Sequence, residues 1–473
     1  MKRLALAGVV IASYFTYFHG YASPAAPFWD ENYHIASAQK YLHGIFFMEL
    51  HPPLGKLLIA LGEWLLRPNA VTSWFVSSDY ATNFPDGFSF AGYRLFPALC
   101  GWATAPVLFA IAWRISRDAI AAACIAALYV FDNALIVHLR GAMLEGPLLL
   151  FSALSIWLFF ILLDAPERRR AAAWTWAALG AAIALAVATK LLGLILFALP
   201  IGLAALGPKE SRRIRRLSAF AAAFVVVYCA VWQIHFDLTR QVNPLLPNDG
   251  YYRASDTYRR VLRTGGTATP ATFLPMLRDS LAYSWSVDRG KPPLDLCKPG
   301  ENGSPFYMWP VGARAIDYRW ESDDDVHYRY LYLQANPAVW ALALVGLLGA
   351  VALLIAAAIA PSLVVLKRRG ALAVFVAMYV GYFVPFFWIH GVMYLYHYFI
   401  PLLLTFVLCA LVLDELRTPR RFAVFAALLV VAGFWFYKPL TYYEPLTNAQ
   451  LQRRAVVRLW DLTCATCRRD ACK

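Results

Sequence analysis

Charged residues are scarce in this chain of 473 residues, where they make up 15% of the sequence, against roughly 25% in soluble globular domains. Hydrophobic residues make up 60% of the chain, and the mean hydropathy is positive, at +0.53. So little charge cannot cover the surface of a soluble protein of this size. The composition therefore excludes an ordinary soluble domain and indicates a polytopic membrane protein.

Several familiar signatures are also missing. The sequence has no glycine-rich loop of the kind that binds nucleotide phosphates, and it has no internal repeat or low-complexity segment beyond alanine-rich runs. Its apolar runs consist mostly of alanine, leucine, valine and phenylalanine. A transporter or lipid flippase would need polar residues near the midpoints of its spans, or broken helices in paired halves. That class of protein is therefore disfavoured.

Eleven apolar runs have about the length needed to cross a hydrocarbon core of ~30 Å. They lie at about residues 4–20, 95–114, 118–131, 142–163, 171–188, 191–207, 218–235, 338–360, 371–389, 396–413 and 421–437. A further run at 54–67 is shorter and predicts an interfacial or re-entrant helix. We therefore predict an all-α membrane protein with about eleven transmembrane helices.

The distribution of lysine and arginine orients these spans, because short basic loops stay in the cytoplasm. If the N-terminus is cytoplasmic, the basic clusters fall on every second turn and all lie inside. They occupy residues 1–3, 114–117, 167–170, 209–216, 367–369 and 417–421. The opposite turns are then extracytoplasmic and hold nearly all the remaining polar residues. Topology and anionic lipid headgroups account for the net charge of +14, so membrane lipids are expected partners and nucleic acid is not.

This orientation divides the chain into four parts. An N-terminal membrane module covers residues 1–235 and contains a first outside loop at 21–93, and a long outside segment follows at 236–337. Amphipathic pieces of that segment predict short helices on the membrane surface. A second membrane module covers 338–437, and an outside tail covers 438–473. A cleaved signal peptide is the alternative for the first apolar run, but we expect an uncleaved anchor.

The eight cysteines divide by this topology. Four of them lie within spans and are expected to behave as small apolar residues. The other four are Cys297, Cys464, Cys467 and Cys472, all on the oxidising side, where an even number favours two disulfides. Metal binding or redox chemistry by the CxxC pair is the alternative, but no second CxxC or histidine pair accompanies it. We predict at least one disulfide among these four cysteines.

The first outside loop contains the adjacent carboxylates Asp30 and Glu31. They follow Pro27-Phe28-Trp29, a plausible helix start, and precede a stretch with helical spacing that ends at Gly44. Asp30 and His34 would share one face of that helix. Ionisable groups at a bilayer face are costly to desolvate and usually serve a purpose, although acidic residues in a first helical turn can also simply stabilise the helix dipole.

The motif HPPLGK at residues 51–56 follows. Two prolines fix an extended entry, and Lys56 stands at the mouth of the next helix, where a lysine can also merely snorkel to the interface. Two outside positions carry arginine, Arg94 in GYRLFPA and Arg140 after DNAL. The segments ATKLLG at 188–193, FYMWP at 306–310 and YLYHYFIP at 394–401 complete an ordered set of motifs.

This ordered set, and above all HPPLGK after an acidic pair, resembles the protein O-mannosyltransferase family of GT-C membrane glycosyltransferases. The match spans about residues 28–401. Eukaryotic members carry a β-trefoil domain in the long loop, for which the segment 236–337 is too short, and Glu145 stands where an aspartate is expected. The chain therefore looks like a bacterial member of the inner membrane with a periplasmic active face.

The resemblance implies transfer of mannose, or another hexose, from a polyprenyl-phosphate donor to Ser or Thr hydroxyls, with inversion. Asp30 would be the general base, and Glu31 would orient the acceptor or raise the basicity of Asp30. Four cations would bind the donor phosphate: Arg94, Arg140, Lys56 and Lys190. Five residues would position the substrates: His34, His51, Glu145, Trp309 and His397.

Two questions stay open at this point. The histidines and carboxylates of the first loop allow a divalent metal, but no compact ligand motif fixes one, and we predict none. The acceptor could also be a glycolipid, as in the lipid A aminoarabinose transferases, which share the fold and an acidic outside loop. HPPLGK favours the mannosyltransferase family over these enzymes.

Overall fold

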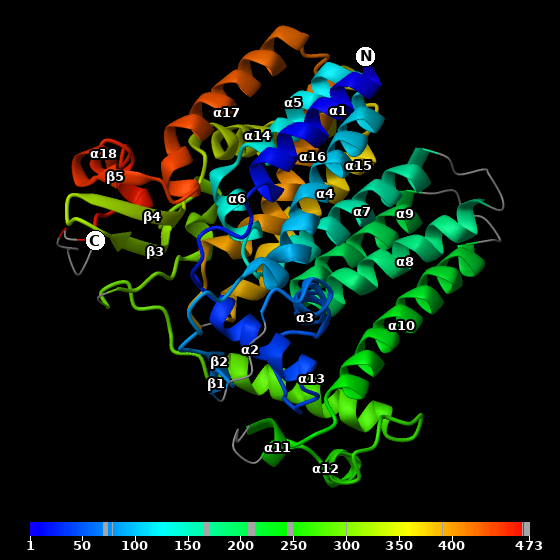
Figure 1. Ribbon diagram of the computed structural model, residues 1–473. Coiled ribbons are helices and arrows are strands. Elements are labelled where there is room, and N and C mark those ends of the chain that lie inside the picture. Colours follow the sequence, from blue (N-terminus) through cyan, green and yellow to red (C-terminus); the bar gives the residue numbers. More distant parts are fainter. Residues whose placement is uncertain are drawn as a thin grey trace.

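The computed structural model describes residues 1–69, 74–77, 79–164, 171–206, 213–243, 249–298, 300–389, 391–465 and 467. Long helices form one bundle, and a smaller layer of short helices and strands covers one end of it (Figure 1). Among the described residues, seven helices are long and apolar enough to cross a membrane, or eight if α5 (Ala119–Val130) and α6 (Asn133–Leu139), bent by 61°, count as one span.

All eleven predicted runs are helical. The seven long ones are α4 (Ala91–Ser116), α7 (Glu145–Asp164), α10 (Arg213–Leu238), α14 (Pro337–Ile359), α15 (Arg369–Phe383) with η4 (Val384–Phe387), η5 (Leu395–Tyr398) with α16 (Phe399–Glu415), and α17 (Arg420–Thr441). The others are the bent pair and three shorter runs: α1 (Lys2–Ser13) with η1 (Tyr14–Phe18), α8 (Ala171–Thr189), and η2 (Leu191–Phe197) with α9 (Ala198–Leu206). The predicted helical membrane bundle is confirmed.

Helix α16 forms the centre of the bundle. In its membrane-crossing window 94% of the residues are buried, against 17% for α10, which lies at the edge (Figure 1). The sequence explains the contrast, because α16 carries large apolar side chains on every face, as expected of a helix enclosed by other helices. The exposed faces of α10 are equally apolar, as lipid contact requires.

The break between α5 and α6 is fixed by Asp132. One carboxylate oxygen accepts a hydrogen bond from the backbone N of Leu135, 2.9 Å away, and so caps α6. The other oxygen accepts bonds from the backbone N of Asn336, at 3.3 Å, and the indole of Trp340, at 2.9 Å. Asp132 therefore joins the start of α6 to the start of α14. The turned α6 then places Arg140 and Glu145 near the first outside loop.

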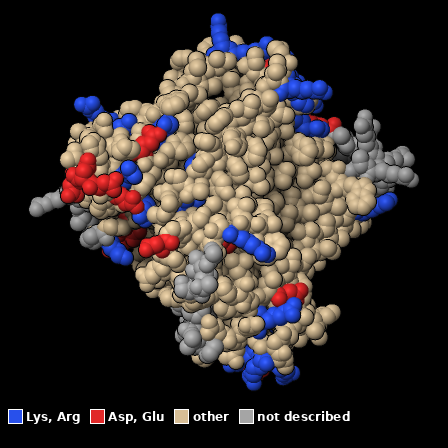
Figure 2. Space-filling model, viewed as in Figure 1, with Lys and Arg blue, Asp and Glu red and all other residues tan. Residues whose placement is uncertain are grey.

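Basic turns lie at the end of the bundle with the N-terminus, although lysines and arginines also appear at the opposite end (Figure 2). At the N-terminal end, Arg114 and Arg368 both pair with Asp164, at 2.9 and 2.8 Å, and Arg420 pairs with Asp118 at 2.5 Å. The predicted cluster at 167–170 lies outside the described residues, as do residues 209–212 of the cluster at 209–216. The described basic turns thus share one end, as the orientation requires, while the identity of the compartments stays a prediction.

The opposite end carries the short elements. They include α2 (Glu31–Leu42), α3 (Leu54–Leu66), a hairpin of β1 (Val76–Ser77) and β2 (Tyr80–Ala81), and the surface helices α11 (Asp249–Arg253), α12 (Asp256–Arg263) and α13 (Phe273–Arg289). The last three confirm the helices predicted from the amphipathic pieces. Gly55 lets α3 pack closely, because a Cβ there would lie 2.6 Å from the side chain of Leu144.

Strands depart from the all-α prediction. β3 (Ile316–Ser322), β4 (His327–Leu333) and β5 (Pro445–Thr447) form an antiparallel sheet in the order β3-β4-β5. β3 and β4 alternate buried and exposed residues over part of their length, which is the strand signal that their aromatic-rich sequences carry. β5 comes from the tail after α17, so the tail and the long outside segment form one structural unit. The helices η3 (Phe306–Val311), α18 (Asn448–Gln452) and η6 (Arg458–Trp460) flank this sheet.

The predicted disulfide is confirmed. Cys464 and Cys467 are bonded to each other, and Cys297 is also disulfide-bonded. Cys472 lies outside the described residues. The four cysteines of the spans, Cys100, Cys124, Cys229 and Cys409, are free.

Candidate active site

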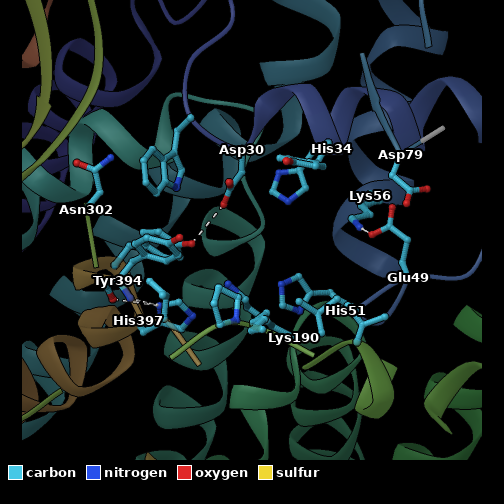
Figure 3. Close-up of a pocket in the computed structure, with 18 of the residues that line it drawn as sticks. Asp30, His34, Glu49, His51, Lys56, Asp79, Lys190, Asn302, Tyr394 and His397 are labelled. Carbon is cyan, nitrogen blue, oxygen red and sulfur yellow. Dashed lines mark hydrogen bonds and ion pairs between the residues drawn. The ribbon is translucent and has the colours of Figure 1, made fainter. Parts of the chain in front are cut away.

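A cavity of about 590 Å³ opens among the short elements. Its walls come from α2 and the chain before it, the segment 48–56, Lys190 after α8, the end of α13, the loop 291–302, and residues 392–397 (Figure 3). Segments from both membrane modules therefore meet at one site. Its lining holds four lysines, three histidines and four carboxylates: Lys56, Lys190, Lys291, Lys298, His34, His51, His397, Asp30, Glu49, Asp79 and Glu301.

Asp30 faces this cavity. It stands at the N-cap position of α2, but its side chain makes no capping hydrogen bond. Instead, one carboxylate oxygen accepts a bond from the Tyr396 hydroxyl, 3.2 Å away (Figure 3). Burial raises the pKa of Asp30 above its ordinary value, while the nearby Lys190 and His138 oppose this rise. A carboxylate so placed keeps lone pairs free for a ligand and has the higher proton affinity that a base needs.

Lys190, Glu145 and His138 form a hydrogen-bonded group of ionisable residues near Asp30. The ammonium of Lys190 donates to Glu145 at 2.5 Å, and His138 Nε2 lies 2.6 Å from the other oxygen of the same carboxylate. Because a carboxylate accepts, His138 Nε2 carries a proton, and Nδ1 lies 2.5 Å from the Tyr318 hydroxyl. Glu145 does not line the cavity. It holds Lys190, whose ammonium does.

Glu31 points away from the cavity, although it follows Asp30 directly. Its side chain is fully buried. It accepts two hydrogen bonds from Arg94, at 2.6 and 2.7 Å, and one each from the backbone N of Phe28 and of Ala142, at 3.1 and 2.7 Å. These four bonds occupy the acceptor sites of a carboxylate. The structure thus places Glu31 in a closed ion pair and not in the wall of the cavity.

Arg94 is equally enclosed. Beyond its two bonds to Glu31, it donates to the carbonyl oxygens of Ala22, Pro24 and Ala26, at 2.7 to 2.8 Å. All five donors of the guanidinium are therefore used within the protein. Arg94 neither lines the cavity nor has a hydrogen for a phosphate, contrary to the expectation from its outside position. Its role is to fix the chain that leads into Asp30.

Arg140 has a similar place. It donates to the carbonyl oxygens of Thr16, His19 and Gly20, at 3.3, 2.9 and 2.5 Å, and its guanidinium lies 5.0 Å from the centre of the Tyr442 ring. It closes the end of η1 and does not line the cavity. Of the four predicted phosphate-binding cations, the structure brings Lys56 and Lys190 to the cavity and leaves both arginines outside it.

Lys56 lies at the far side of the cavity from Tyr394 and His397 (Figure 3). It is buried and paired with Glu49, and burial lowers its pKa to about 7. Asp79 lines the same region and pairs with Lys40 at 3.3 Å. Neither Glu49 nor Asp79 was among the site residues predicted from the sequence.

The three predicted histidines all reach the cavity. His34 Nδ1 donates to the carbonyl oxygen of Ala142 at 2.7 Å, and burial lowers its pKa to about 3, so the ring is neutral with Nε2 as an acceptor. Burial also lowers the pKa of His51 well below its usual range. His397 stacks on Trp309, with ring centres 6.0 Å apart. Trp309 is fully buried behind it and supports the wall without lining it.

Among the described residues, no group of three or more His, Cys, Asp or Glu side chains could hold a metal ion. The charges that line the cavity are instead lysines and carboxylates, of which Asp79, Lys56, Glu49 and Lys190 form ion pairs. This arrangement suits a ligand that carries an anion and a hydroxyl group: cations can bind the first, and Asp30 can take a proton from the second.

Two family models match the chain. One, described as dolichyl-phosphate-mannose-protein mannosyltransferase, covers residues 9–208, and the other, the C-terminal four-span region of protein O-mannosyltransferase, covers residues 294–460. The chain belongs to the protein O-mannosyltransferase family. Together the two matches contain Asp30, Lys56, Glu145, Lys190, Tyr396 and His397.

Curated relatives agree. The chain is 29% identical to protein O-mannosyltransferase 1 of Drosophila pseudoobscura over 252 residues, which are 50% of this chain and 27% of that protein. It is 30% identical to dolichyl-phosphate-mannose–protein mannosyltransferase 4 of Schizosaccharomyces pombe over 205 residues, 42% of this chain and 26% of that one. The chain thus matches about a quarter of the length of each relative.

The fold has solved counterparts. A chain of the S. cerevisiae protein O-mannosyltransferase complex bound to the sugar donor superposes with a TM-score of 0.81, at 16% identity, over 97% of this chain and 92% of that one. The Archaeoglobus fulgidus oligosaccharyltransferase gives a TM-score of 0.52, at 12% identity, over 93% and 56% of the two chains. The protein is therefore a GT-C membrane protein of the protein O-mannosyltransferase type.

Sequence reasoning missed part of the site of this family member. Tyr396 stands in the quoted motif at 394–401, and Glu49 lies two residues before HPPLGK, so both were near a signal. Lys291 and Glu301 had none, because the loop 291–302 reaches the cavity only through folding. Trp29 lines the cavity next to Asp30, and its aromatic character alone gave no reason to single it out.

Proposed function

We propose that this protein transfers a mannosyl unit from a polyprenyl-phosphate donor to Ser or Thr hydroxyls of extracytoplasmic proteins, with inversion at the anomeric carbon. The proposal takes its reaction from the printed names of the relatives, which use dolichyl-phosphate mannose and act on proteins. The observation that carries it is the position of Asp30, a buried carboxylate in a lysine-lined cavity of a family member.

Asp30 is the general base of this proposal. In a single displacement the acceptor hydroxyl attacks the anomeric carbon from the face opposite the phosphate, and Asp30 takes its proton as the new bond forms. The phosphate leaves with the electron pair of the glycosidic bond. Asp30 accepts one hydrogen bond among the described residues, so its second oxygen can receive the hydroxyl. Glu31 has no such freedom, since Arg94 and two backbone amides bind it.

Lys190 stabilises the leaving phosphate. Its ammonium has three donors, and its bond to Glu145 uses one and fixes the direction of the others. A preorganised cation that receives the charge developing on the phosphate lowers the barrier more than a mobile one. His397, His51 and Lys291 line the same cavity and complete the phosphate site, in place of the predicted Arg94 and Arg140. Lys56 lies at the opposite end of the cavity from this phosphate site (Figure 3).

The polyprenyl chain approaches Lys190 from the side of the bundle. Directly after Lys190, η2 exposes Leu191 and Leu194, which are 38% and 51% accessible. Exposed Val384 and Phe387 of η4 continue this apolar surface, and η2 packs against α15, which η4 extends. A lipid tail in contact with these side chains would stay in the hydrocarbon while its phosphate reaches the lysine.

The active face is extracytoplasmic in this proposal, and the membrane is the bacterial inner membrane. The positive-inside rule supports the orientation, because the basic turns share the end of the bundle opposite Asp30. The absence of any described β-trefoil between α10 and α14 and the cysteine-containing tail support an organism in which the enzyme faces an oxidising periplasm.

A reconstituted assay tests the proposal. The purified protein in nanodiscs would receive polyprenyl-phosphate mannose together with a Ser/Thr-containing peptide or with lipid A. We expect α-linked mannose on the peptide hydroxyl from a β-linked donor, measured by mass spectrometry and NMR, and no transfer by Asp30→Asn. Transfer to lipid A alone would replace the protein acceptor with a glycolipid. Loss of hexose from periplasmic Ser/Thr peptides in a deletion strain would give the same answer in cells.

A further inference from the structure

Trp29, immediately before Asp30, has an unusual backbone. Its φ angle is +51°, in the left-handed region that costs a bulky side chain about 1–2 kcal/mol. Its indole Nε1 is buried, and its contact with the Tyr396 hydroxyl falls short of a well-formed hydrogen bond, which is a second cost. Such costs persist only where the surroundings impose them, and they gather at functional sites. The structure around Trp29 shows what imposes them.

Three tyrosines surround the indole ring. It stacks on Tyr318 of β3, with ring centres 5.0 Å apart and planes 15° apart. It also meets Tyr394 edge to face at 5.2 Å and Tyr396 edge to face at 6.3 Å. We call Trp29, Tyr318 and Tyr396 the aromatic clamp, and Tyr394 packs against its edge. Such ring pairs each add about 0.5–1.5 kcal/mol beyond the area that they bury, enough together to hold one strained residue.

The clamp also contacts Asp30 directly. The Tyr396 hydroxyl donates to its carboxylate at 3.2 Å. Tyr396 cannot easily turn away, because its ring stacks on those of His138 and His397, each with its centre 4.7 Å away and its plane tilted by 23°. The backbone of Asp30 is therefore aimed by Trp29, and its carboxylate is held by a tyrosine that is itself fixed.

We propose that the aromatic clamp is a positioning device for the base: Trp29 and Tyr318 set the direction of the Asp30 side chain, and Tyr396 holds its carboxylate toward the acceptor hydroxyl. The inference rests on the proposed function, in which Asp30 is the base. It makes β3, and with it the extracytoplasmic sheet, part of the catalytic apparatus. Tyr396 acts through Asp30 and does not contact the reacting atoms.

This role has a signature in the pH dependence. The charged and titratable groups that face Asp30 come from several elements: His138 on α6, Glu145 on α7, Lys190 after α8, Lys56 on α3, Tyr318 on β3, and Tyr394 and Tyr396. The hydrogen bond from Tyr396 favours the ionised carboxylate and so lowers its pKa. Its removal raises that pKa further, and a base that must be ionised then works only at higher pH.

Tyr396→Phe tests this inference, with Tyr394→Phe as the matched control. Both changes remove one hydroxyl from neighbouring stacked rings of the cavity wall, whose centres are 5.6 Å apart, but only the first removes the bond to Asp30. In Tyr396→Phe we expect the acidic limb of kcat/KM to move up by roughly one pH unit, with kcat about tenfold lower and donor KM within about twofold. In Tyr394→Phe the limb should stay in place. An unmoved limb in Tyr396→Phe would overturn the proposal.

Trp29→Leu supplies an independent measurement. The clamp requires kcat to fall by about tenfold or more while the dissociation constant of the donor, measured by titration, changes little. The opposite pattern, weaker donor binding with normal kcat, would make Trp29 a donor-binding residue and exclude the clamp. Asp30→Asn distinguishes failure of the proposed function from failure of the clamp. If this variant retains activity, Asp30 is not the base. If it is inactive while Tyr396→Phe shows no shift of the acidic limb, only the clamp proposal fails.

Discussion

Two buried charge clusters lie back to back at the start of α2, and they are built on adjacent residues, Asp30 and Glu31. In the Glu31–Arg94 cluster, five guanidinium donors meet two carboxylate oxygens and three carbonyls. In the Asp30 cluster, the carboxylate accepts one hydrogen bond among the described residues and faces a cavity of about 590 Å³. The Glu31–Arg94 cluster is therefore closed to ligands, whereas the Asp30 cluster is open to the cavity.

The difference separates a structural charge from a chemical one. A buried ion pair is tolerated when every donor and acceptor is satisfied, and the Glu31–Arg94 cluster meets that condition by tying residues 22–28 to α4 and to the turn before α7. The Asp30 cluster leaves acceptor capacity unused beside lysines, which is costly for stability and useful for a ligand. Variants of the two clusters should therefore fail in different measurements.

Asp30→Asn should have the largest effect. It keeps the shape of the side chain and removes its basicity, so we expect kcat to fall by roughly 10²–10⁴-fold while donor binding and the melting temperature stay close to wild type. Glu31→Gln is the comparison, because it should lower the melting temperature first. Retention of more than about a tenth of wild-type kcat in Asp30→Asn would contradict the expected effect of losing a general base.

Arg94→Ala should chiefly destabilise the protein. Removal of the guanidinium leaves the Glu31 carboxylate and three carbonyl oxygens buried without donors, a change that costs about 3–5 kcal/mol in buried pairs. Thermal unfolding in detergent measures it. Arg94→Lys should rescue little, because one ammonium cannot replace five directed donors. Normal stability combined with weakened donor binding would place Arg94 at the phosphate after all.

Lys190→Ala should act on the other cluster. If Lys190 receives the leaving phosphate, as proposed, loss of this preorganised cation should lower kcat/KM by roughly 10²–10³-fold, or about 2.7–4 kcal/mol. Lys298→Ala is the matched control, since this exposed lysine lines the mouth of the same cavity. Equal losses in both variants would show that the cavity responds to total charge and not to one placed ammonium.

The double substitution Cys464→Ser with Cys467→Ser should have the smallest effect. The bond closes a short loop in the tail, so its removal should cost about 2 kcal/mol or less by loop entropy, seen as a lower melting temperature. Both charge clusters lie elsewhere, so kcat should be unchanged. A large loss of kcat would mean that the tail supports the cavity through the sheet.

Much of this molecule is readable from the sequence. The spans follow from apolar length, and the helix from Glu31 to Leu42 follows from its spacing and the positive-φ Gly44 after it. HPPLGK correctly placed Lys56 at the start of α3, where it reaches the cavity. The strands β3 and β4 were missed although their residues alternate, because an expectation of surface helices governed the whole outside segment.

The cations show where such reasoning stops. Arg94, Arg140, Lys56 and Lys190 all stand at outer ends of apolar segments, and nothing local distinguishes them. The distinction lies in the partners: carbonyls of the chain before α2 enclose the two arginines, whereas Glu145 and Glu49 leave the two lysines at a cavity wall. Those partners are up to 124 residues away in sequence.

The sequence by itself determined the class of the protein, its helical spans, its family and the loop that holds Asp30, because apolar length and short motifs are local properties. The tertiary structure decided which of the two adjacent carboxylates, Asp30 or Glu31, faces the cavity. Consecutive residues of a helix point about 100° apart, so Asp30 and Glu31 must face different surroundings. Only the packing of α4, α6, α8, β3 and η5 around that turn makes one side a closed ion pair and the other a cavity.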